Sequence, residues 1–263
     1  MRKLVRLAAM LLIMLLLFTG CAATPEAEDT LEIGAPASST PPLSSGSGEQ
    51  AAPIQTPAGN SVGSRKTGAA AVTIVDSIAL HFPGTLYGGV AYKNEGSAPV
   101  TLTAASFTFS YSGKTQTSDF TPIAAEQDIV LPGETGYCTL WLPYDDALGA
   151  PEDMKVTAEL TAAAAEQSPQ ALTVEDARLI QNYPGFATLS GSIKNPGNKA
   201  CDLNMVYAAF YDEQNALLGV WYFTRNAVLQ PGEDAAFVVH LQALPIEGLA
   251  EQTKEIRFRA FGI

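Results

Sequence analysis

The sequence contains few of the residues that catalytic and metal sites use. Among its 263 residues are two histidines and three cysteines. Nucleophilic catalysis requires a serine or cysteine beside a base, and a zinc site requires about four ligands. His81 and His240 lie far apart, and no serine stands in a Gly-x-Ser-x-Gly motif. We therefore expect neither an enzyme nor a cofactor or zinc site, with an unrecognised hydrolase as a distant alternative.

Basic residues are also scarce. The chain has 15 Lys and Arg against 27 Asp and Glu, a formal charge of −12. Binding to DNA or RNA depends on Lys and Arg that neutralise phosphates, so an acidic chain of this kind is not expected to bind nucleic acid.

The amino terminus, residues 1–20, has the pattern of a secretory signal. Three basic residues precede an unbroken apolar run from Leu7 to Phe18. Twelve residues are too few to cross a bilayer of about 30 Å as a helix. Without this segment the chain has 12 basic and 27 acidic residues, a formal charge of −15.

The signal ends in "FTGC", which resembles the lipobox of bacterial lipoproteins. The resemblance implies that Cys21 carries a diacylglycerol, and with it palmitate-type chains, and becomes the first residue of the mature protein. The chain would then be attached to the bacterial cell membrane and face its extracytoplasmic side. The alternative is an ordinary signal peptide followed by an unrelated cysteine.

No Phe, Trp or Tyr occurs between Thr19 and His81. Residues 22–70 consist mainly of Ala, Ser, Pro, Gly, Thr and Glu, which cannot bury enough apolar surface to fold. We expect residues 21–70 to be the lipidated cysteine and a disordered tether with a span of roughly 40 Å.

Beyond residue 70 the sequence is typical of an all-β protein. Short segments rich in β-branched and aromatic residues alternate with Gly, Pro and Asn clusters. "KN-x-G" occurs at Lys93–Gly96 and at Lys194–Gly197, and "PGE" recurs at Pro132–Glu134 and Pro231–Glu233. We predict two tandem immunoglobulin-like β-sandwich domains, 71–165 and 166–263, each of about seven strands.

The second repeat resembles the FxLYD-type immunoglobulin-like domains of bacterial surface lipoproteins. Three short motifs carry the resemblance: "KNPG" at Lys194–Gly197, "AAFYD" at Ala208–Asp212 and "QPGE" at Gln230–Glu233. Ala208 stands where that family has its first Phe. The resemblance implies a fold and a location, and no catalytic residue follows from it.

The two repeats differ on one sheet face. In the first repeat, alternation predicts that Phe107 and Phe109 face the core while Ser106, Thr108 and Ser110 face solvent.

In the second repeat the outer positions of the same strand hold aromatic residues. With a two-residue loop before the next strand, Tyr207, Tyr211 and Tyr222 share one face, and Trp221 points into the core. An uncharged aromatic face often marks an interface. These three tyrosines are our candidate partner-binding residues; the alternative is that they pack on the first repeat.

Two further sets of residues are of the types that form metal sites or disulfides. Asp145, Asp146, Glu152 and Asp153 cluster in a Gly/Pro loop and are weak calcium candidates, since their spacing matches no defined calcium loop. Cys138 and Cys201 occupy core-type positions of different repeats, which favours two buried free thiols over a disulfide between the domains.

Together these features predict a non-catalytic, lipid-anchored module of the cell envelope that holds a protein or another envelope component. The alternative is a purely architectural accessory without a ligand.

Overall fold

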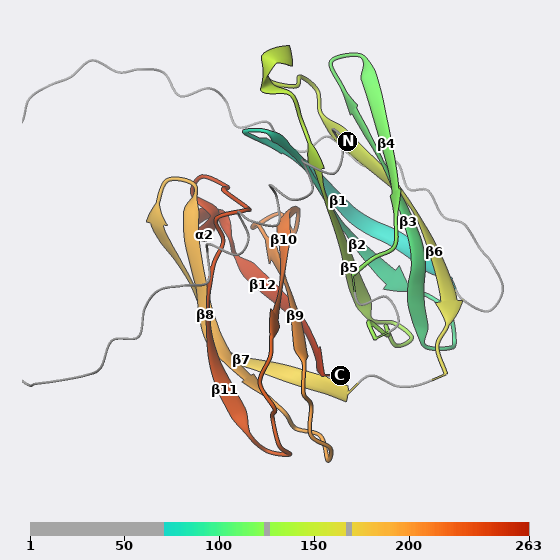
Figure 1. The fold of residues 1–263 in the computed structure, drawn as a ribbon, viewed down its shortest axis with the longest axis vertical. Helices are drawn as coiled ribbons and strands as arrows, with labels where there is room; N and C mark the ends of the chain where they lie inside the picture. Colours follow the sequence, from blue (N-terminus) through green and yellow to red (C-terminus); the bar gives the residue numbers. More distant parts are fainter. Residues whose placement is uncertain (1–70, 124–126, 167–169, 263) are drawn as a thin grey trace, which may run out of the picture. The chain divides into compact units, whose positions relative to one another are not determined.

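The computed structural model describes residues 71–123, 127–166 and 170–262 (Figure 1). The segments predicted to be the signal peptide, the lipidated Cys21 and the tether lie outside the described residues. The described part is all-β, as predicted, and its strands form antiparallel sheets.

The first half of the described chain is a sandwich of two three-stranded sheets. One sheet has the order β1-β2-β5 and the other has the order β4-β3-β6. Their strands are β1 (Val72–Phe82), β2 (Thr85–Asn94), β3 (Val100–Tyr111), β4 (Lys114–Phe120), β5 (Thr135–Pro143) and β6 (Lys155–Ala164).

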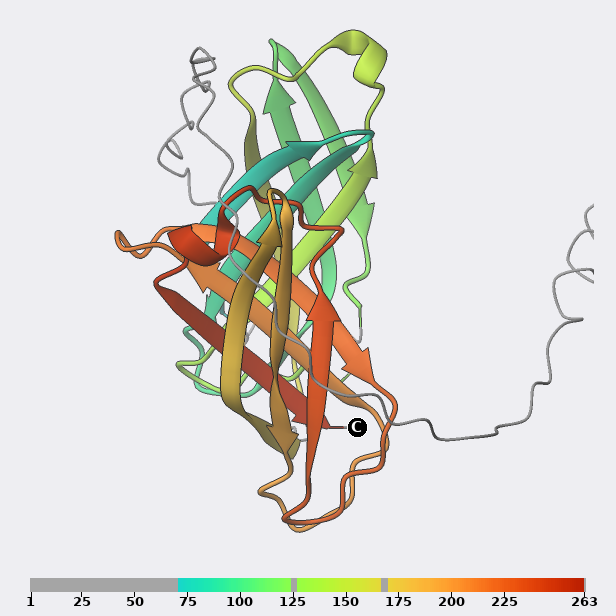
Figure 2. The same cartoon turned by 90° about the vertical axis from the view of Figure 1, so that its left-hand side faces the viewer.

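The second half repeats this arrangement, with the two layers joined through one long strand. The order is β10-β9-β12-β7-β8-β11. Strand β7 pairs with β12 through its first three residues and with β8 along the rest, so that the layers face each other (Figure 2). The strands are β7 (Gln170–Tyr183), β8 (Phe186–Lys194), β9 (Asn204–Tyr211), β10 (Leu217–Arg225), β11 (Asp234–His240) and β12 (Glu255–Gly262).

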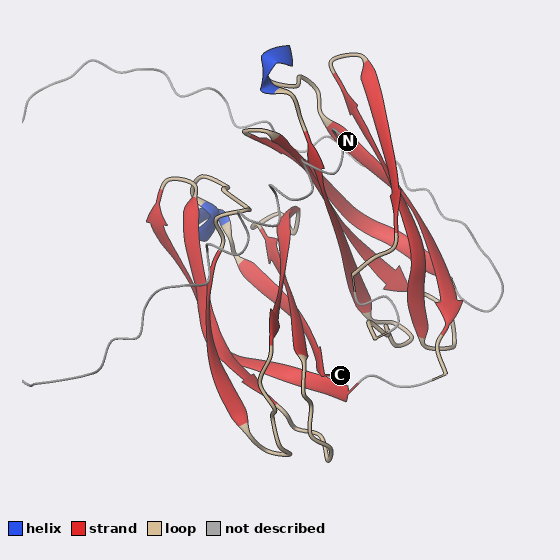
Figure 3. Cartoon of the chain, viewed as in Figure 1, coloured by secondary structure: helices blue, strands red, loops and turns tan. Residues whose placement is uncertain are grey.

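Each half therefore has six strands in the described residues, where the sequence predicted about seven. The predicted boundary at 165/166 falls between β6 and β7. Among the described residues, helix is limited to the short turns η1 (Asp146–Leu148) and α2 (Leu249–Gln252), drawn in blue in Figure 3.

Alternation along the strands builds a separate core in each half. Phe107 and Phe109 are fully buried in the first core, and Ala208 and Phe210 are fully buried in the second, as predicted. Burial of a large apolar side chain contributes about 1.5–3 kcal/mol, so these inward positions carry much of the stability of each sandwich.

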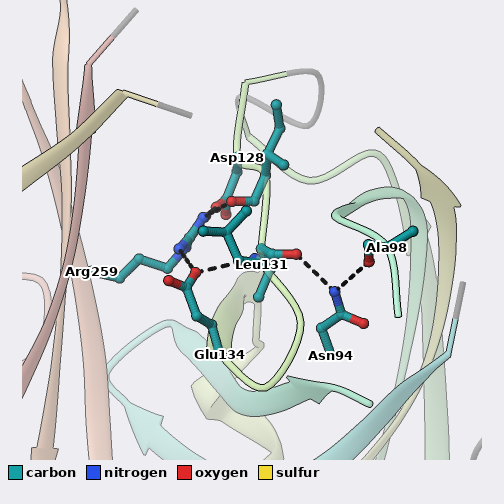
Figure 4. Close-up of polar contacts among 8 residues, drawn as sticks. Asn94, Ala98, Asp128, Leu131, Glu134 and Arg259 are labelled. Carbon is teal, nitrogen blue, oxygen red and sulfur yellow. Dashed lines mark hydrogen bonds and ion pairs between the residues drawn. The ribbon is translucent and has the colours of Figure 1, made fainter. Parts of the chain in front are cut away.

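The repeated "KN-x-G" and "PGE" motifs form one structural unit in each half. In the first half, Asn94 is fully buried and its Nδ2 donates hydrogen bonds to the carbonyls of Ala98 (2.9 Å) and Val130 (2.8 Å), shown in Figure 4. Its Oδ1 accepts from the amide of Gly96, and its carbonyl accepts from the amide of Gly133.

Asn195 makes the same contacts in the second half. Its Nδ2 donates to the carbonyls of Lys199 (2.8 Å) and Leu229 (2.9 Å), and its Oδ1 accepts from the amide of Gly197. The glutamate of each "PGE", Glu134 or Glu233, accepts from the amide three residues before it. In the first half, the two motifs therefore form a buried polar junction between the β2–β3 and β4–β5 connections. The same motifs form an equivalent junction in the second half.

The side chains of the β9–β10 hairpin face as predicted, although the loop between the two strands differs from the predicted one. Its loop has five residues rather than two, closed by Asp212, whose Oδ1 accepts from the amides of Gln214 and Ala216. A bulge between Leu217 and Gly219 then restores the register, because one extra residue reverses the facing of every later side chain.

Candidate interaction surface

The predicted aromatic face exists, and the first half covers it. Tyr207 pairs with Tyr222 across β9 and β10, with Val220 on the same side. Tyr207 and Tyr211 are only 4% and 3% exposed, and they cluster with Ala91 and Tyr137 of the first half. The structure thus brings the three tyrosines together as predicted, but contradicts their role as a free surface for an external partner. The alternative, packing on the first repeat, is what the structure shows.

Aromatic rings from the β1-β2-β5 sheet meet this face. The centroid of Tyr137 lies 6.4 Å from that of Tyr207, and the centroid of Trp141 lies 5.9 Å from that of Tyr222. Trp141 also contacts Trp221 edge-on at 6.0 Å. Such tilted and edge-on geometries are the favourable ones for aromatic pairs.

Tyr87 on β2 fixes the interface with a pair of hydrogen bonds. Its phenol donates to the carbonyl of Val220 and accepts from the amide of Val220, each at 2.8 Å. Tyr87 is fully buried and belongs to the core cluster of the second half. A side chain of the first half is thus part of the second half's core.

Arg259 on β12 forms a buried ion pair with the first half. Its Nε donates to Oδ1 of Asp128 (2.9 Å) and its Nη1 donates to Oε2 of Glu134 (3.2 Å), as Figure 4 shows. Its Nη2 donates to the carbonyl of Ile129. The side chains of Arg259 and Asp128 are 10% and 8% exposed. The interface therefore joins opposite charges as well as apolar faces.

For both Asp128 and Arg259, burial and ion pairing shift the pKa in opposite directions. Burial raises the pKa of the Asp128 carboxyl, although the charge and hydrogen bonds of Arg259 oppose that shift. Burial is the largest single effect on Arg259 and by itself would lower its pKa, but the charge and hydrogen bond of Asp128, together with Tyr92 and Glu134, outweigh it and the pKa rises. Because a guanidinium keeps its proton throughout the ordinary pH range, Asp128 is the member of the pair that titrates first.

Sequence reasoning missed the arginines of this face. Arg257 and Arg259 alternate with inward-facing Phe258 along β12, and they pair with Ala209 and Tyr207 of the aromatic face. Extending the alternation from β9 to the last strand would have placed both there. Arg257 stays within the second half, stacked 4.1 Å from the ring centroid of Tyr211.

Asp128 lies in a loop that the second half shortens. Residues 121–134 connect β4 to β5, whereas residues 226–233 connect β10 to β11, which is six residues fewer. Counted back from "PGE", Asp128 corresponds to Ala227, and buried Ile129 corresponds to Val228, which is 55% exposed. The contact to Arg259 is therefore specific to the first half.

The interface encloses little free space at its edge. A hollow of about 10 Å³ lies between Ile123, Tyr137, Tyr207 and Tyr222. That volume is enough for about one water molecule, so this hollow is too small for a substrate or an organic ligand.

The calcium candidates serve turns rather than one common point. Asp146 Oδ2 accepts from the amide of Gly84 (2.7 Å) and its Oδ1 lies 3.2 Å from Nε2 of His81; these contacts lower the pKa of Asp146. Asp145 accepts from the amide of Ala147. Neither Glu152 nor Asp153 joins them, since the described residues contain no group of three or more His, Cys, Asp or Glu side chains that could hold a metal.

The remaining candidate residues are isolated. His240 faces outward beside Thr188, in a different half from His81. Cys138 and Cys201 are free and buried, each in the core of its own half, as predicted. Burial raises the pKa of both thiols, which makes them poor nucleophiles.

No protein-family model matches the chain, and no curated protein matches it. Among solved structures, it is similar to red sea bream transglutaminase (12% identity, 67% of this chain, 27% of that one, TM-score 0.22). It is also similar to β-glucuronidase 2 of Bacteroides uniformis (16% identity, 60% and 21% covered, TM-score 0.19). The chain thus spans about a quarter or less of these proteins, and TM-scores this low carry no functional argument.

Within the described residues, none of the helices is long and apolar enough to span a bilayer.

Proposed function

We propose that this chain is a non-catalytic scaffold module of a bacterial cell envelope. Lipid on Cys21 attaches it to the membrane, residues 22–70 tether it, and two immunoglobulin-like sandwiches of the FxLYD type lie on the extracytoplasmic side. The sequence supports the anchor through its signal and lipobox pattern. Two lipid chains would suffice for stable attachment, at about 0.8 kcal/mol for each buried methylene group.

The observation that carries the scaffold proposal is the interface between the halves. It combines an aromatic face, the Tyr87–Val220 hydrogen bonds and the buried Arg259–Asp128 pair. Contacts of all three kinds in one place restrain both the distance and the angle between two domains. A body restrained in this way is suited to hold a protein or an envelope component at a set distance from the membrane.

A second candidate is an architectural accessory without any ligand. The burial of Tyr207 and Tyr211 favours it, because the residues expected to bind a partner are used inside the chain. The two candidates differ in whether another surface of the molecule captures a partner.

The anchor is tested by metabolic labelling with an alkyne palmitate analogue in cells that express the native protein or Cys21→Ala. We expect the native protein to be labelled, to sediment with membranes and to be digested by protease added outside the cytoplasmic membrane. Cys21→Ala should be unlabelled and released. Native protein that is unlabelled and soluble would refute the anchor.

The restrained body is tested by spin labels on exposed Lys114 and Lys199, one in each half. We expect a single narrow distance distribution by pulsed electron resonance, and a broad distribution would refute a fixed spacer.

A further inference from the structure

Exposed apolar side chains gather on one sheet of the second half. Eight large hydrophobic residues are exposed in the described chain, and four of them lie on the β7-β8-β11 sheet or at the tip of its β7–β8 hairpin. They are Ile180 (53% exposed), Tyr183 (71%), Phe186 (45%) and Val238 (65%). Scattered apolar residues are normal on a surface, but a group of four is a feature of interaction sites.

This sheet is the counterpart of the one with which the first half contacts the second. "Phe-Pro-Gly" at residues 82–84 and "Tyr-Pro-Gly" at residues 183–185 close the equivalent hairpins, and Gly84 and Gly185 both have a φ near +74°. Phe82 is partly buried, and its ring centroid lies 6.3 Å from that of Tyr87, which belongs to the core cluster of the second half. Tyr183, at the same position of its own hairpin, is exposed.

The strand pairing extends this correspondence across the sheet. In the first half, the row that reaches the second half consists of Leu80, Tyr87 and Trp141. The same row in the second half consists of Ile180, Thr188 and His240. The residue on the first strand of the row stays apolar, Leu80 or Ile180, whereas Tyr87 and Trp141 are replaced by the smaller polar Thr188 and His240.

We propose that the β7-β8-β11 face and the Tyr183–Phe186 tip bind a β-sandwich domain of another envelope protein. This rests on the proposed function and names the partner class of that scaffold. The occupant is a sandwich because the equivalent sheet of the first half contacts one, through the hydrogen bonds of Tyr87 with Val220 and the edge-on contact of Trp141 with Trp221. It belongs to another protein because the matching aromatic face of this chain, at Tyr207 and Tyr211, is already covered. The mixed apolar and polar composition is that of non-obligate interfaces.

Charge argues against a lipid surface as the occupant. Helix α2 lies beside the hairpin, where the amide of Ala250 donates to Oε1 of Gln181, and it carries the exposed Glu251. The exposed Arg178 is on the face itself, paired with Ser190 next to Val238, but the chain as a whole is acidic. Anionic headgroups attract basic residues and repel such a surface.

The test places a photo-crosslinking amino acid at Tyr183 in the full-length lipidated protein in its own cells. A matched chain carries it at Leu148, which is 59% exposed in the first half. Captured proteins are identified by mass spectrometry, purified, and titrated with the native protein, with Tyr183→Ser/Phe186→Ser and with the control Leu148→Ser/Val228→Ser. We expect capture at Tyr183 of a protein that contains a β-sandwich. The Tyr183/Phe186 double substitution should weaken binding about tenfold or more, and the control should leave it unchanged.

The proposal would be overturned if Tyr183 crosslinked to lipid, to residues 21–70 of the same chain, to a second copy, or to nothing. It would also be overturned by a captured partner without a β-sandwich, or by unchanged affinity of the Tyr183/Phe186 variant. Capture at Leu148 alone would overturn this surface but leave the scaffold function standing. Loss of membrane attachment in the palmitate experiment would instead refute the anchor on its own.

Discussion

The phenol of Tyr87 satisfies both backbone groups of Val220, donating to its carbonyl and accepting from its amide at 2.8 Å. Strand β10 is at the edge of its sheet, so outward-pointing backbone groups have no neighbouring strand. At this residue a side chain from the first half takes the place of a strand. The polar groups of an exposed edge are thereby turned into a specific contact between the two halves.

Tyr87→Phe should destabilise the protein, since it leaves the buried amide and carbonyl of Val220 without partners. Each unpaired group costs about 1–3 kcal/mol. We expect a lower urea midpoint and faster hydrogen exchange of the Val220 amide. The matched control is Tyr92→Phe, because the equally buried hydroxyl of Tyr92 makes no hydrogen bond with the described residues. It should be neutral or stabilising, and equal losses for the two variants would contradict the role assigned to Tyr87.

Arg259→Gln should be among the most destabilising single substitutions of β12. It leaves the Asp128 carboxylate buried without its charge partner, which typically costs about 3–5 kcal/mol. Arg257→Gln is the control two residues earlier on the same face, where the ion pair with Glu255 is partly solvated. Its loss should stay below about 1 kcal/mol. Chemical unfolding of both variants measures the difference, and a reversed order would remove the ion pair from the account of the interface.

Asn94→Asp and Asn195→Asp should each destabilise strongly, although both changes keep the shape of the side chain. A carboxylate cannot donate to the two carbonyls that each amide bonds, one buried and one partly buried, so these oxygens are left facing a like charge. Thermal unfolding should show comparable losses in the two halves. Exposed Asn182→Asp serves as the control and should change little. A large loss in one half alone would mean that the two junctions are not equivalent.

Asp128 and Asp146 should contribute to the pH dependence of stability with opposite signs. Burial holds the folded-state pKa of Asp128 above its ordinary value of 3.8, so the folded protein binds the proton more tightly. Its contribution to the free energy of unfolding therefore decreases as the pH rises from about 4 through the folded-state pKa. The pKa of Asp146 is lowered, so its contribution is present above pH 3.8 and is lost as the pH falls through the folded-state value.

Comparing the native chain with Asp128→Asn and Asp146→Asn by urea unfolding between pH 3 and 7 tests both signs. Replacing Asp128 should make the stability curve rise more steeply with pH, and replacing Asp146 should make it rise less steeply. The slopes are compared rather than the absolute stabilities, because Asp128→Asn also weakens the contact to Arg259. Equal slopes in all three proteins would contradict both shifts.

Local patterning predicted the faces of the strands correctly. Alternation placed Phe107 and Phe210 inside and Tyr207 and Tyr222 on the opposite face, because the side-chain period of a strand is fixed at two residues. The loop before β10 was predicted wrongly, yet a bulge compensated for it. A bulge depends on the three-dimensional geometry of the hairpin. The alternation of residues within the strand does not predict that geometry.

What covers the aromatic face could not be read from either repeat alone. The answer depends on Asp128, whose counterpart in the second half is Ala227, and on Arg259, 131 residues further along the chain. Sequence comparison showed that the repeats differ at Tyr207 and Tyr211, but the complementary surface on β2 and β5 becomes visible only when the two halves are assembled.

The polar β3 strand of the first half gives the pair a defined beginning. Ser106, Thr108 and Ser110 stand there at the positions that Tyr207, Ala209 and Tyr211 occupy in the second half. In modular arrays, a terminal unit with a polar outer surface stops growth at that end. The described first sandwich thus presents a polar β3 face where the second presents the aromatic face that is buried between the halves. In the described residues the two repeats therefore have different tasks: the second presents the aromatic face, and the first presents the sheet that covers it.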